Sequence, residues 1–321
     1  MNGDIKLGIT LYSFATEFIH EKLDLDECLK KAHDMGYKGV EIVAAMMVPE
    51  YPYPSDEWLA WFKERLAFYE LEPVCWSAYI DMGIRSDRDL TEDEIIRFTV
   101  NDMIYAKKAG FPLVRTQQAI SPAIFRKMLP YCKDLGVKLA VEMHHPHHPE
   151  VPMWKEYFDI MKNEGEGWLG FVPDFSIFQK MPHKLYLDQA LEFGCRKEKL
   201  DEIIQMHANG ATEADLEGKD FNEIELHTAA EMFAKFSAPA RIEQLKDVLD
   251  IAPYIHGKFY YLPDGKHDPC IPFEEILATI KECGYKGYIS SEYEGHHFDE
   301  TVDSEEQLKR YVELCSNILN N

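Results

Sequence analysis

The sequence predicts a (β/α)8 TIM barrel, and two observations support this fold class. The first is a repeated signal in which an amphipathic helix ends at a glycine and an apolar strand follows within a few residues; Gly36, Gly110, Gly136 and Gly284 mark four such ends. Glycine suits the left-handed position just past a helix, and continuously apolar strands suit a parallel sheet that is buried on both faces. The repeats therefore predict successive βα units.

The second observation is the number of these units. Strands are expected near residues 6–13, 39–44, 73–79, 113–118, 138–144, 169–174, 255–261 and 287–292. Eight units favour a closed barrel, because an open, doubly wound sheet rarely reaches that number. An open sheet of that kind would also carry a glycine-rich phosphate turn after its first strand, and the segment from Leu11 to Phe14 is not such a turn.

The spacing of the units is regular except between the sixth and seventh strands. There, about eighty residues replace the roughly thirty expected in such a barrel. We interpret this stretch, about 179–253, as a helical insertion that covers the barrel mouth or contacts a partner. No linker-like segment interrupts the chain, so residues 1–321 are expected to form a single TIM-barrel domain.

Composition and charge argue against several classes of function. The formal net charge of −23, with no local cluster of Lys and Arg, would repel nucleic acid, so no nucleic-acid partner is expected. No apolar run is long enough to cross a bilayer, and the first residues do not resemble a secretory signal, so we expect a cytoplasmic protein without membrane contact. The seven cysteines are scattered, which indicates reduced thiols and not a zinc or redox motif.

Four expected strands carry, at or near an end, a residue that suits a metal ion: Glu142, Asp174, His256 and Glu292. Catalytic groups of such barrels lie at the C-terminal ends of the strands, so these four side chains can converge at the mouth. Three carboxylates and one imidazole suit one divalent ion, with Mn²⁺ preferred because oxygen donors dominate, and Co²⁺, Mg²⁺ and Zn²⁺ as alternatives. The competing interpretation is four solitary polar residues, but three buried carboxylates without a cation would cost several kcal/mol each.

The loop after the fifth strand is rich in histidine, with His144, His145, His147 and His148 set between prolines. Strand alternation points His144 the same way as Glu142, and His145 begins the loop and could swing over the metal site. Histidine is the usual proton carrier near neutral pH, so one of these two is the expected general base. His147 and His148 are better explained as lid or surface residues, and an adventitious histidine-rich loop is the alternative for the whole run.

Weaker candidates near the same end of the barrel, or in the long segment, are Glu294, His296, His297, Trp76, Arg115, Gln117, Gln118 and His207. The three that follow the eighth strand could contact substrate hydroxyls. Barrel packing explains those on the third and fourth strands equally well, and a surface position is the better explanation for His207.

The order of these candidates resembles the xylose isomerase-like barrel superfamily, which includes sugar isomerases, ketose 3-epimerases, inosose dehydratases and metal-dependent abasic-site endonucleases. The resemblance covers essentially the whole chain and implies the fold and the metal site, but not one reaction. Ketose 3-epimerases use the strand-five and strand-eight glutamates as a proton-transfer pair, and Glu142 and Glu292 match them. However, Ile177 and Leu262 stand where those enzymes have a further histidine and arginine, which puts plain epimerase chemistry in doubt. The acidity of the chain argues against the endonuclease branch.

Within this superfamily, the chain is similar to the larger, catalytic (alpha) subunit of bacterial C-glycoside deglycosidases. The similarity lies in the opening segment from Gly8 to Phe14, in the histidine-proline run after Glu142, and in the long segment before the seventh strand. It implies cleavage of the carbon–carbon bond between a 3-oxo-glucosyl unit and an aromatic aglycone. It also implies a small beta subunit as partner in a hetero-oligomer, and His145 as the catalytic histidine.

The leading hypothesis is therefore a metal-dependent carbon–carbon lyase that acts on 3-oxo-C-glycosides. A metal-bound ketone at C3 makes the C2 proton more acidic, so that a histidine can remove it and the aglycone can leave from C1. A sugar or inositol isomerase, epimerase or dehydratase is the alternative, because isomerases and epimerases share the first half of this path. A non-catalytic sugar-binding barrel is disfavoured, since it would not need four convergent ligands.

Overall fold

Eight parallel strands form one sheet in the order β6-β5-β4-β3-β2-β1-β8-β7. The computed structural model describes residues 5–320. The strands are β1 (Lys6–Thr10), β2 (Gly39–Val43), β3 (Glu72–Ser77), β4 (Leu113–Thr116), β5 (Lys138–Met143), β6 (Leu169–Pro173), β7 (Tyr254–Phe259) and β8 (Tyr288–Tyr293). All eight expected strands are present, and the predicted barrel is confirmed. The first strand is shorter than expected, because the Thr10 hydroxyl caps a 3₁₀ turn at Leu11–Phe14.

The two ends of the sheet meet at β6 and β7. No ladder of several residue pairs joins these strands within the described residues; a single parallel bridge pairs Asp174 with His256. The barrel is therefore nearly closed, and its seam lies at two of the four candidate metal ligands.

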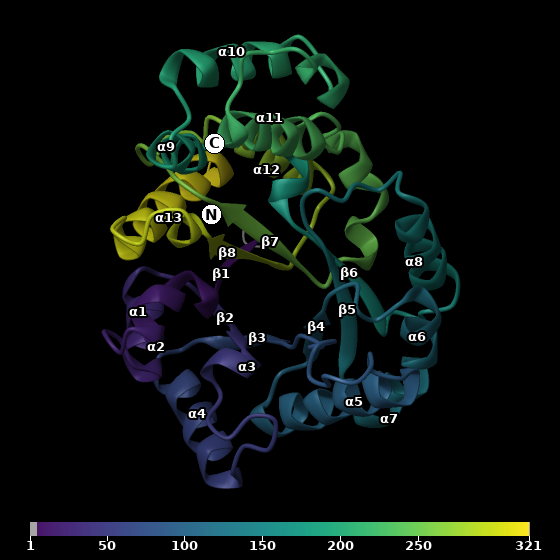
Figure 1. The fold of residues 1–321 in the computed structure, drawn as a ribbon. Helices are drawn as coiled ribbons and strands as arrows, with labels where there is room; N and C mark the ends of the chain where they lie inside the picture. The colour runs from purple at the N-terminus through teal and green to yellow at the C-terminus, as the bar shows by residue number, and fades with distance from the viewer. Residues whose placement is uncertain (1–4, 321) are drawn as a thin grey trace.

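Helices surround the strands (Figure 1). They are α1 (Ala15–Ile19), α2 (Leu25–Asp34), α3 (Ala44–Met47), α4 (Asp56–Phe68), α5 (Glu92–Ala109), α6 (Pro122–Lys127), α7 (Leu129–Leu135), α8 (Pro152–Asn163), α12 (Phe273–Glu282) and α13 (Ser304–Asn320). The helix-glycine-strand signal has the expected backbone: Gly110 ends α5 and Gly136 ends α7, both with a left-handed φ, of 91° and 67°. Glycine adopts this conformation without a steric penalty, which fixes where each helix turns back to its strand.

Three α-helices lie between β6 and β7: α9 (Lys184–Glu192), α10 (Lys197–Ala208) and α11 (Glu223–Phe236). They pack on one another and form a group at the top of the view in Figure 1. Part of the group has its own small apolar cluster, which includes Ile203, Met232 and Phe233. This group therefore has a source of local stability apart from the barrel core.

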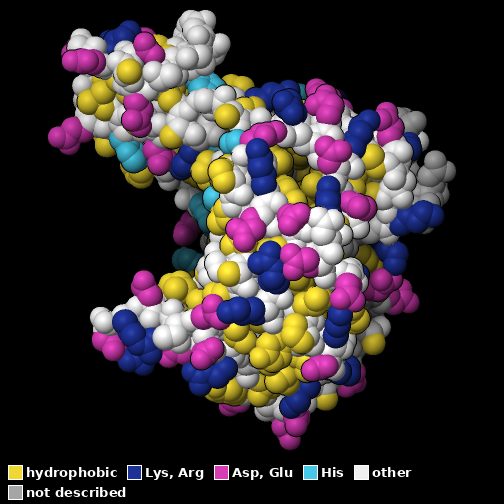
Figure 2. Space-filling model, turned by 90° about the vertical axis from the view of Figure 1, so that its right-hand side faces the viewer, with side chains coloured by type: hydrophobic (Ala, Val, Ile, Leu, Met, Phe, Trp, Pro, Cys, Tyr) yellow, Lys and Arg dark blue, Asp and Glu magenta, His cyan; other side chains and the backbone are white. Residues whose placement is uncertain are grey.

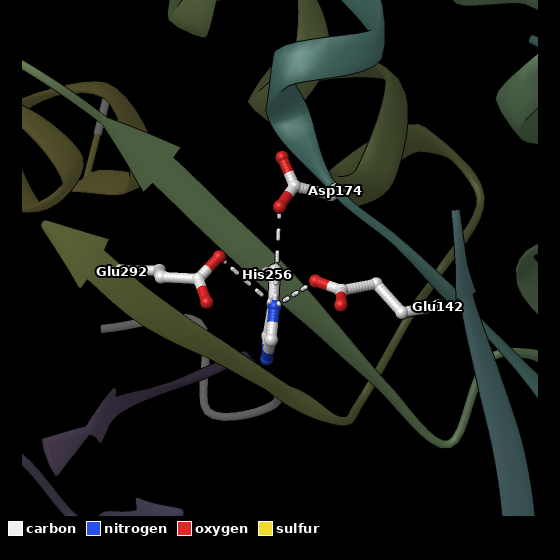
Figure 3. Close-up of side chains that lie close together, drawn as sticks. All are labelled: Glu142, Asp174, His256 and Glu292. Atoms are coloured by element: carbon white, nitrogen blue, oxygen red, sulfur yellow. Dashed lines mark hydrogen bonds and ion pairs between the residues drawn. The ribbon is translucent and has the colours of Figure 1, made fainter. Parts of the chain in front are cut away.

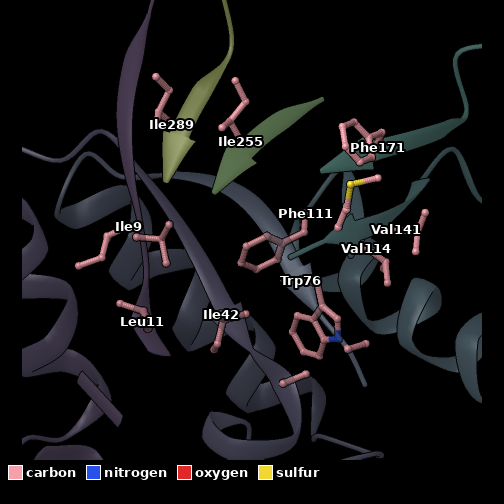
Figure 4. Packing of buried hydrophobic residues seen from close by; sticks show 14 of the residues in the cluster. Ile9, Leu11, Ile42, Trp76, Phe111, Val114, Val141, Phe171, Ile255 and Ile289 are labelled. Carbon is pink, nitrogen blue, oxygen red and sulfur yellow. The ribbon is translucent and has the colours of Figure 1, made fainter. Parts of the chain in front are cut away.

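Apolar side chains pack on both faces of the sheet. The larger cluster fills the space between strands and helices, and includes Ile42, Val114 and Val141 (Figure 4). A smaller cluster, formed by Val74, Cys75, Leu113, Ala140, Val172 and Tyr254, draws on five strands. Leu113, Ala140, Val172 and Tyr254 each lie two residues before an ionisable residue of the barrel mouth. Residues two apart on a strand point to the same face, so this cluster lies beneath the charged groups.

Among residues 5–320, no helix combines the length and apolar character needed to cross a membrane. All seven cysteine thiols are free, and only Cys283 is exposed. Burial raises the pKa of Cys75, Cys28 and Cys315, so these thiols behave as small apolar groups and not as nucleophiles.

The close contact between β7 and α13 gives a test of the fold. A Cβ atom at Gly257 would overlap the hydroxyl of the buried Tyr311 and lie 3.0 Å from Ile289 Cγ2. Gly257→Ala is therefore expected to lower the free energy of unfolding by about 1–3 kcal/mol, measured by urea denaturation. A second change, Tyr311→Phe, should restore part of the loss because it removes the overlapping hydroxyl. Gly83→Ala in an exposed loop is the control, and equal midpoints for the two alanine variants would contradict the tight packing.

Candidate metal centre and active site

Glu142, Asp174, His256 and Glu292 converge on one point at the barrel mouth. One ligand atom from each lies within 4.8 Å of the others, and all four residues are buried. The Nδ1 atom of His256 lies 2.6 Å from Glu142 Oε1, 3.1 Å from Glu292 Oε2 and 3.9 Å from Asp174 Oδ2. Figure 3 shows the three carboxylates directed at this side of the imidazole.

The convergence follows from strand geometry. Side chains alternate between the two faces of a strand, so inward positions recur every second residue. Ala140 and Glu142 on β5, Val172 followed by Asp174 at the end of β6, and Tyr254 and His256 on β7 share this inward parity. The apolar member of each pair belongs to the smaller apolar cluster, and the ionisable member lies one layer nearer the mouth.

The side chains present fit a divalent metal ion. Asp174 Oδ2 and Glu292 Oε2 are buried and accept no hydrogen bond; their ion pairs with Lys258 show that they already attract positive charge. Adjacent ligands of an octahedral ion with bonds of about 2.1 Å are about 3 Å apart, close to the separations around His256 Nδ1. Three carboxylates and one imidazole also form a donor set typical of such ions.

The charge at the mouth is not balanced by the side chains alone. Five carboxylates, those of Glu41, Glu142, Asp174, Glu292 and Glu294, surround two permanent cations, Arg115 and Lys258. Although burial lowers the pKa of His256, the carboxylates of Glu292, Glu41 and Glu142 outweigh burial and raise this pKa well above its ordinary value. Burial raises the pKa of Asp174 to about 8, even beside Lys258. Both shifts indicate a site that takes up positive charge.

Glu41, which sequence reasoning missed, holds the far side of the His256 ring. Its Oε2 lies 2.7 Å from His256 Nε2, and its Oε1 accepts a hydrogen bond from Arg115 at 3.1 Å. Arg115 also donates to Glu142 Oε2, at 2.5 Å. Because Glu41 engages Nε2, the Nδ1 atom of the imidazole faces the other three carboxylates. A carboxylate on the far ring nitrogen orients metal-binding histidines in proteins in the same way.

Lys258 is the second buried residue that the sequence did not single out. Its Nζ lies 3.2 Å from Asp174 Oδ2, 3.1 Å from Glu292 Oε2 and 3.0 Å from Glu294 Oε1. Burial lowers the pKa of Lys258, but these carboxylates raise it further, so that the ammonium stays charged. The signal that could have found Lys258 is its position two residues after His256, on the same face of β7.

A polar cavity of about 440 Å³ opens above the candidate ligands. Its walls are Tyr12, Tyr79, Arg115, Gln117, Glu142, His144, His145, Ser176, Lys258, Tyr260, Glu292 and Glu294. Figure 2 shows a hollow on the left of the molecule, below a projection at the height of α9 to α11, with histidine side chains along it. The cavity is lined mainly by hydrogen-bonding and charged groups, which suits a ligand with many hydroxyls.

Both candidate base histidines line this cavity. The Nδ1 atom of His144 lies 2.8 Å from the His145 carbonyl. The Nε2 atom of His145 donates to the carbonyl of Lys235, at 2.7 Å, and its ring stacks on Phe236 with a centroid separation of 4.9 Å. His145 therefore has one tautomer, with the proton on Nε2 and a lone pair on Nδ1.

The weaker candidates divide between the mouth and the core. Arg115, Gln117 and Glu294 line the polar cavity, and the Gln118 side chain donates to the Glu142 carbonyl. Trp76 instead lies in the core, where its indole N–H donates to Asp102. Strand alternation explains this difference, because Trp76 follows Cys75 of the smaller cluster and so points to the other face of β3.

The remaining histidines lie around the rim of the site or away from it. His297 is hydrogen-bonded to the Tyr12 hydroxyl at 2.7 Å, and His296 packs edge-on against Tyr12. His147 contacts Trp154, outside the cavity, and His207 lies at the end of α10 near Phe233. These positions leave His144 and His145 as the two histidines that line the polar cavity.

The role of Glu41 gives a test that does not depend on any activity. Glu41→Gln keeps an acceptor near His256 but removes its charge, so we expect the affinity for Mn²⁺ to fall by about tenfold or more. Isothermal titration with Mn²⁺ measures this, with circular dichroism to verify that the variant is folded. Glu72→Gln, at the opposite end of the barrel, is the matched control. Equal affinities for the two variants would contradict the role of Glu41.

Comparisons with known proteins agree with the fold. The family model described as xylose isomerase-like TIM barrel matches residues 29–316. The alpha subunit of 3'-dehydrocarminate deglycosidase from Microbacterium sp is 30% identical over 94% of this chain and 92% of its own length. The alpha subunit of C-glycoside deglycosidase from Microbacterium trichothecenolyticum is 27% identical over 91% of this chain and 84% of its own length.

Solved structures show the same fold at low sequence identity. The IOLI protein with a binding zinc atom has a TM-score of 0.60 and 16% identity, and covers 98% of both chains. A D-allulose 3-epimerase from Methylomonas sp. in complex with D-allulose has a TM-score of 0.59 and 12% identity, covering 98% of this chain and 97% of its own. The match over residues 29–316, together with this barrel, shows that the chain belongs to the xylose isomerase-like TIM barrel family.

Proposed function

We propose that the chain is the catalytic subunit of a metal-dependent carbon–carbon lyase that cleaves 3-oxo-C-glycosides. The observation that carries this proposal is the buried cluster of three carboxylates and His256 beneath a polar cavity that also contains His145. Relatives at 25–30% identity that are named deglycosidase alpha subunits support the same assignment.

Glu142, Asp174, His256 and Glu292 would hold the ion, and the oxygen-rich set favours Mn²⁺, with Co²⁺, Mg²⁺ or Zn²⁺ as alternatives. A divalent ion bound there supplies Lewis acidity next to a ketone at C3, which makes the proton at C2 easier to remove. Lys258 and Arg115 place two fixed positive charges beside the same ligands. Together with a bound divalent ion, these two cations would stabilise negative charge that develops on the sugar.

His145 is the base that we propose for the C2 proton. Its Nε2–H is fixed on the Lys235 carbonyl, so Nδ1 carries the lone pair that accepts a proton. Burial lowers the pKa of His145 to about 4, which keeps the imidazole neutral near pH 7. His144 is the alternative base, since it lines the same cavity.

The elimination balances without an oxidant or reductant. The C2–H bond breaks as His145 takes the proton, a C1=C2 double bond forms, and the bond from C1 to the aromatic carbon breaks. The departing aromatic carbon keeps the electron pair and takes up one proton. The products are an unsaturated 3-oxo sugar and the free aglycone, and the base is restored when the imidazolium gives up its proton.

A sugar or inositol isomerase, epimerase or dehydratase with the same metal site is the second candidate. Glu142 and Glu292, which both contact His256 Nδ1 at the mouth, favour it because they are the pair that would move a proton between the two faces of a sugar. Two observations weigh against it: Arg115 engages Glu142, and Ile177 and Leu262 are buried apolar residues. The mouth therefore lacks the extra histidine and arginine at those two positions.

We propose a small beta subunit as the partner in a hetero-oligomer. The relatives are named alpha subunits, a name that implies a second chain. The substrate is proposed to be a 3-oxo-glycoside or a similar sugar-like molecule, in line with the hydrogen-bonding walls of the polar cavity.

Product analysis tests the proposed reaction. The metal-loaded protein, with its partner subunit added, is mixed with a 3-oxo-C-glucosyl flavonoid and, in parallel, with free ketohexoses. We expect aglycone release that a chelator abolishes and Mn²⁺ restores, and that falls on the order of 10²- to 10⁴-fold in His145→Ala. His148→Ala, three residues away in the same loop, is the control. Interconversion of the ketohexoses without aglycone release would establish the isomerase or epimerase instead.

The pH dependence of kcat/KM tests the identity of the base. Because burial lowers the pKa of His145 to about 4, the imidazole is protonated, and inactive as a base, only below about that pH. With Mn²⁺ in excess, the acid limb of kcat/KM should therefore lie near pH 4, and the rate should change little from there to neutrality. A limb near 6.5, the ordinary histidine pKa, would point to an exposed histidine as the base.

A further inference from the structure

A second cavity, of about 260 Å³, adjoins the polar cavity on the side of α9 and α11. Five of its lining residues are aromatic: Tyr186, Phe193, Phe236, Tyr260 and Phe298. We call this space the aromatic chamber. The imidazole of His183 adds a further flat ring, stacked on Tyr260 with a centroid separation of 4.1 Å. Burial lowers the pKa of His183 to about 3, so that this ring is neutral and adds no charge to the wall.

His145 and Tyr260 line both cavities, so the two spaces meet at these side chains. One face of the His145 ring packs on Phe236, a wall of the chamber, and the same residue lines the polar cavity. A ligand that fills both spaces would therefore place the bond between its two parts beside the proposed base.

The two spaces differ in chemistry. The polar cavity contains Arg115, Lys258 and several carboxylates, whereas flat rings dominate the chamber. The chamber also has a polar stripe along one face of α11, formed by His227, Glu231 and Lys235 at intervals of four residues, with Glu231 and Lys235 ion-paired at 2.6 Å. Such groups can hydrogen-bond to phenolic hydroxyls, while the ring faces contact an aromatic system.

The size of the chamber limits what can occupy it. A complete ligand site usually has about 300–1,000 Å³, so a chamber of about 260 Å³, just below this range, suits one part of a ligand. A helix or loop of another protein would be too large to enter. A flat ring system bearing hydroxyls matches both the size and the lining.

We propose that the aromatic chamber binds the hydroxylated aromatic group of the substrate, while the polar cavity binds its sugar. This inference rests on the proposed lyase function, and it assigns α9 and α11 a direct part in selecting the aglycone. Phe193, at the end of α9, and Ile224, on α11, both line the chamber.

Binding of apigenin, a hydroxylated flavone without a sugar, tests the chamber without any turnover. Titration calorimetry is carried out on the chelated protein, with and without its partner subunit. Apigenin should bind in both cases, because the chamber contains no metal ligand. Phe193→Ala should weaken binding about fivefold through loss of one aromatic contact, and Ile224→Trp should weaken it on the order of tenfold by filling the space.

The matched control is Phe68→Ala, since Phe68 is 67% exposed and Phe193 is 63% exposed, but Phe68 lies on α4, away from the mouth. In steady-state assays with a 3-oxo-C-glucosyl flavone, Phe193→Ala should raise KM and leave kcat within about twofold. Neither Phe193→Ala nor Ile224→Trp should change the affinity for a free ketohexose, which has no aromatic part.

Three results would separate the two proposals. Cleavage of the glycoside with unchanged apigenin affinity and unchanged KM in both variants would overturn the chamber and leave the lyase intact. Loss of apigenin binding when the partner subunit is added would also overturn it, by showing that the subunit covers the chamber. Apigenin binding that depends on Phe193 and Ile224 in a protein that cleaves no glycoside would support the chamber and overturn the lyase.

Discussion

Burial of like charges around His256 is the constraint on which the barrel mouth depends. Glu142, Asp174 and Glu292 point at one side of the imidazole and Glu41 at the other, and all of these side chains are buried. Removing carboxylates from water is unfavourable unless positive charge and hydrogen bonds replace the lost hydration. Arg115 and Lys258 supply part of that charge, and a divalent ion would supply the rest. The smaller apolar cluster below gives these groups a rigid base.

The sequence predicts the strands and the convergence of Glu142, Asp174, His256 and Glu292, because both depend on local patterns. Apolar runs after glycine-ended helices define the strands, and an ionisable residue at a strand end stands out against such a run. Glu41 does not stand out, since it lies inside a short apolar strand and its meaning depends on which face of β2 points inward. Its partners, Arg115 and His256, are 74 and 215 residues away in the sequence, so no local pattern could connect them.

The same limit applies to the long segment before β7. Its length and its helices are visible in the sequence, but its contact with the mouth is not. The hydrogen bond from His145 to the Lys235 carbonyl spans 90 residues and depends on how α11 packs across the barrel. Neither the tautomer of His145 nor the wall of the aromatic chamber could therefore be derived from periodicity. Both come from tertiary packing.

The seam between β6 and β7 has a consequence for the lifetime of the protein. A single bridge, from Asp174 to His256, joins these strands in place of a ladder, and both residues are candidate ligands. An ion bound there would link β6 to β7 where the two strands lack a hydrogen-bonded ladder. Binding energy would then add directly to the cost of opening, and local unfolding in the metal-free state would begin at this seam. Supply of the ion would set the resistance of the chain to proteolysis as well as its chemistry.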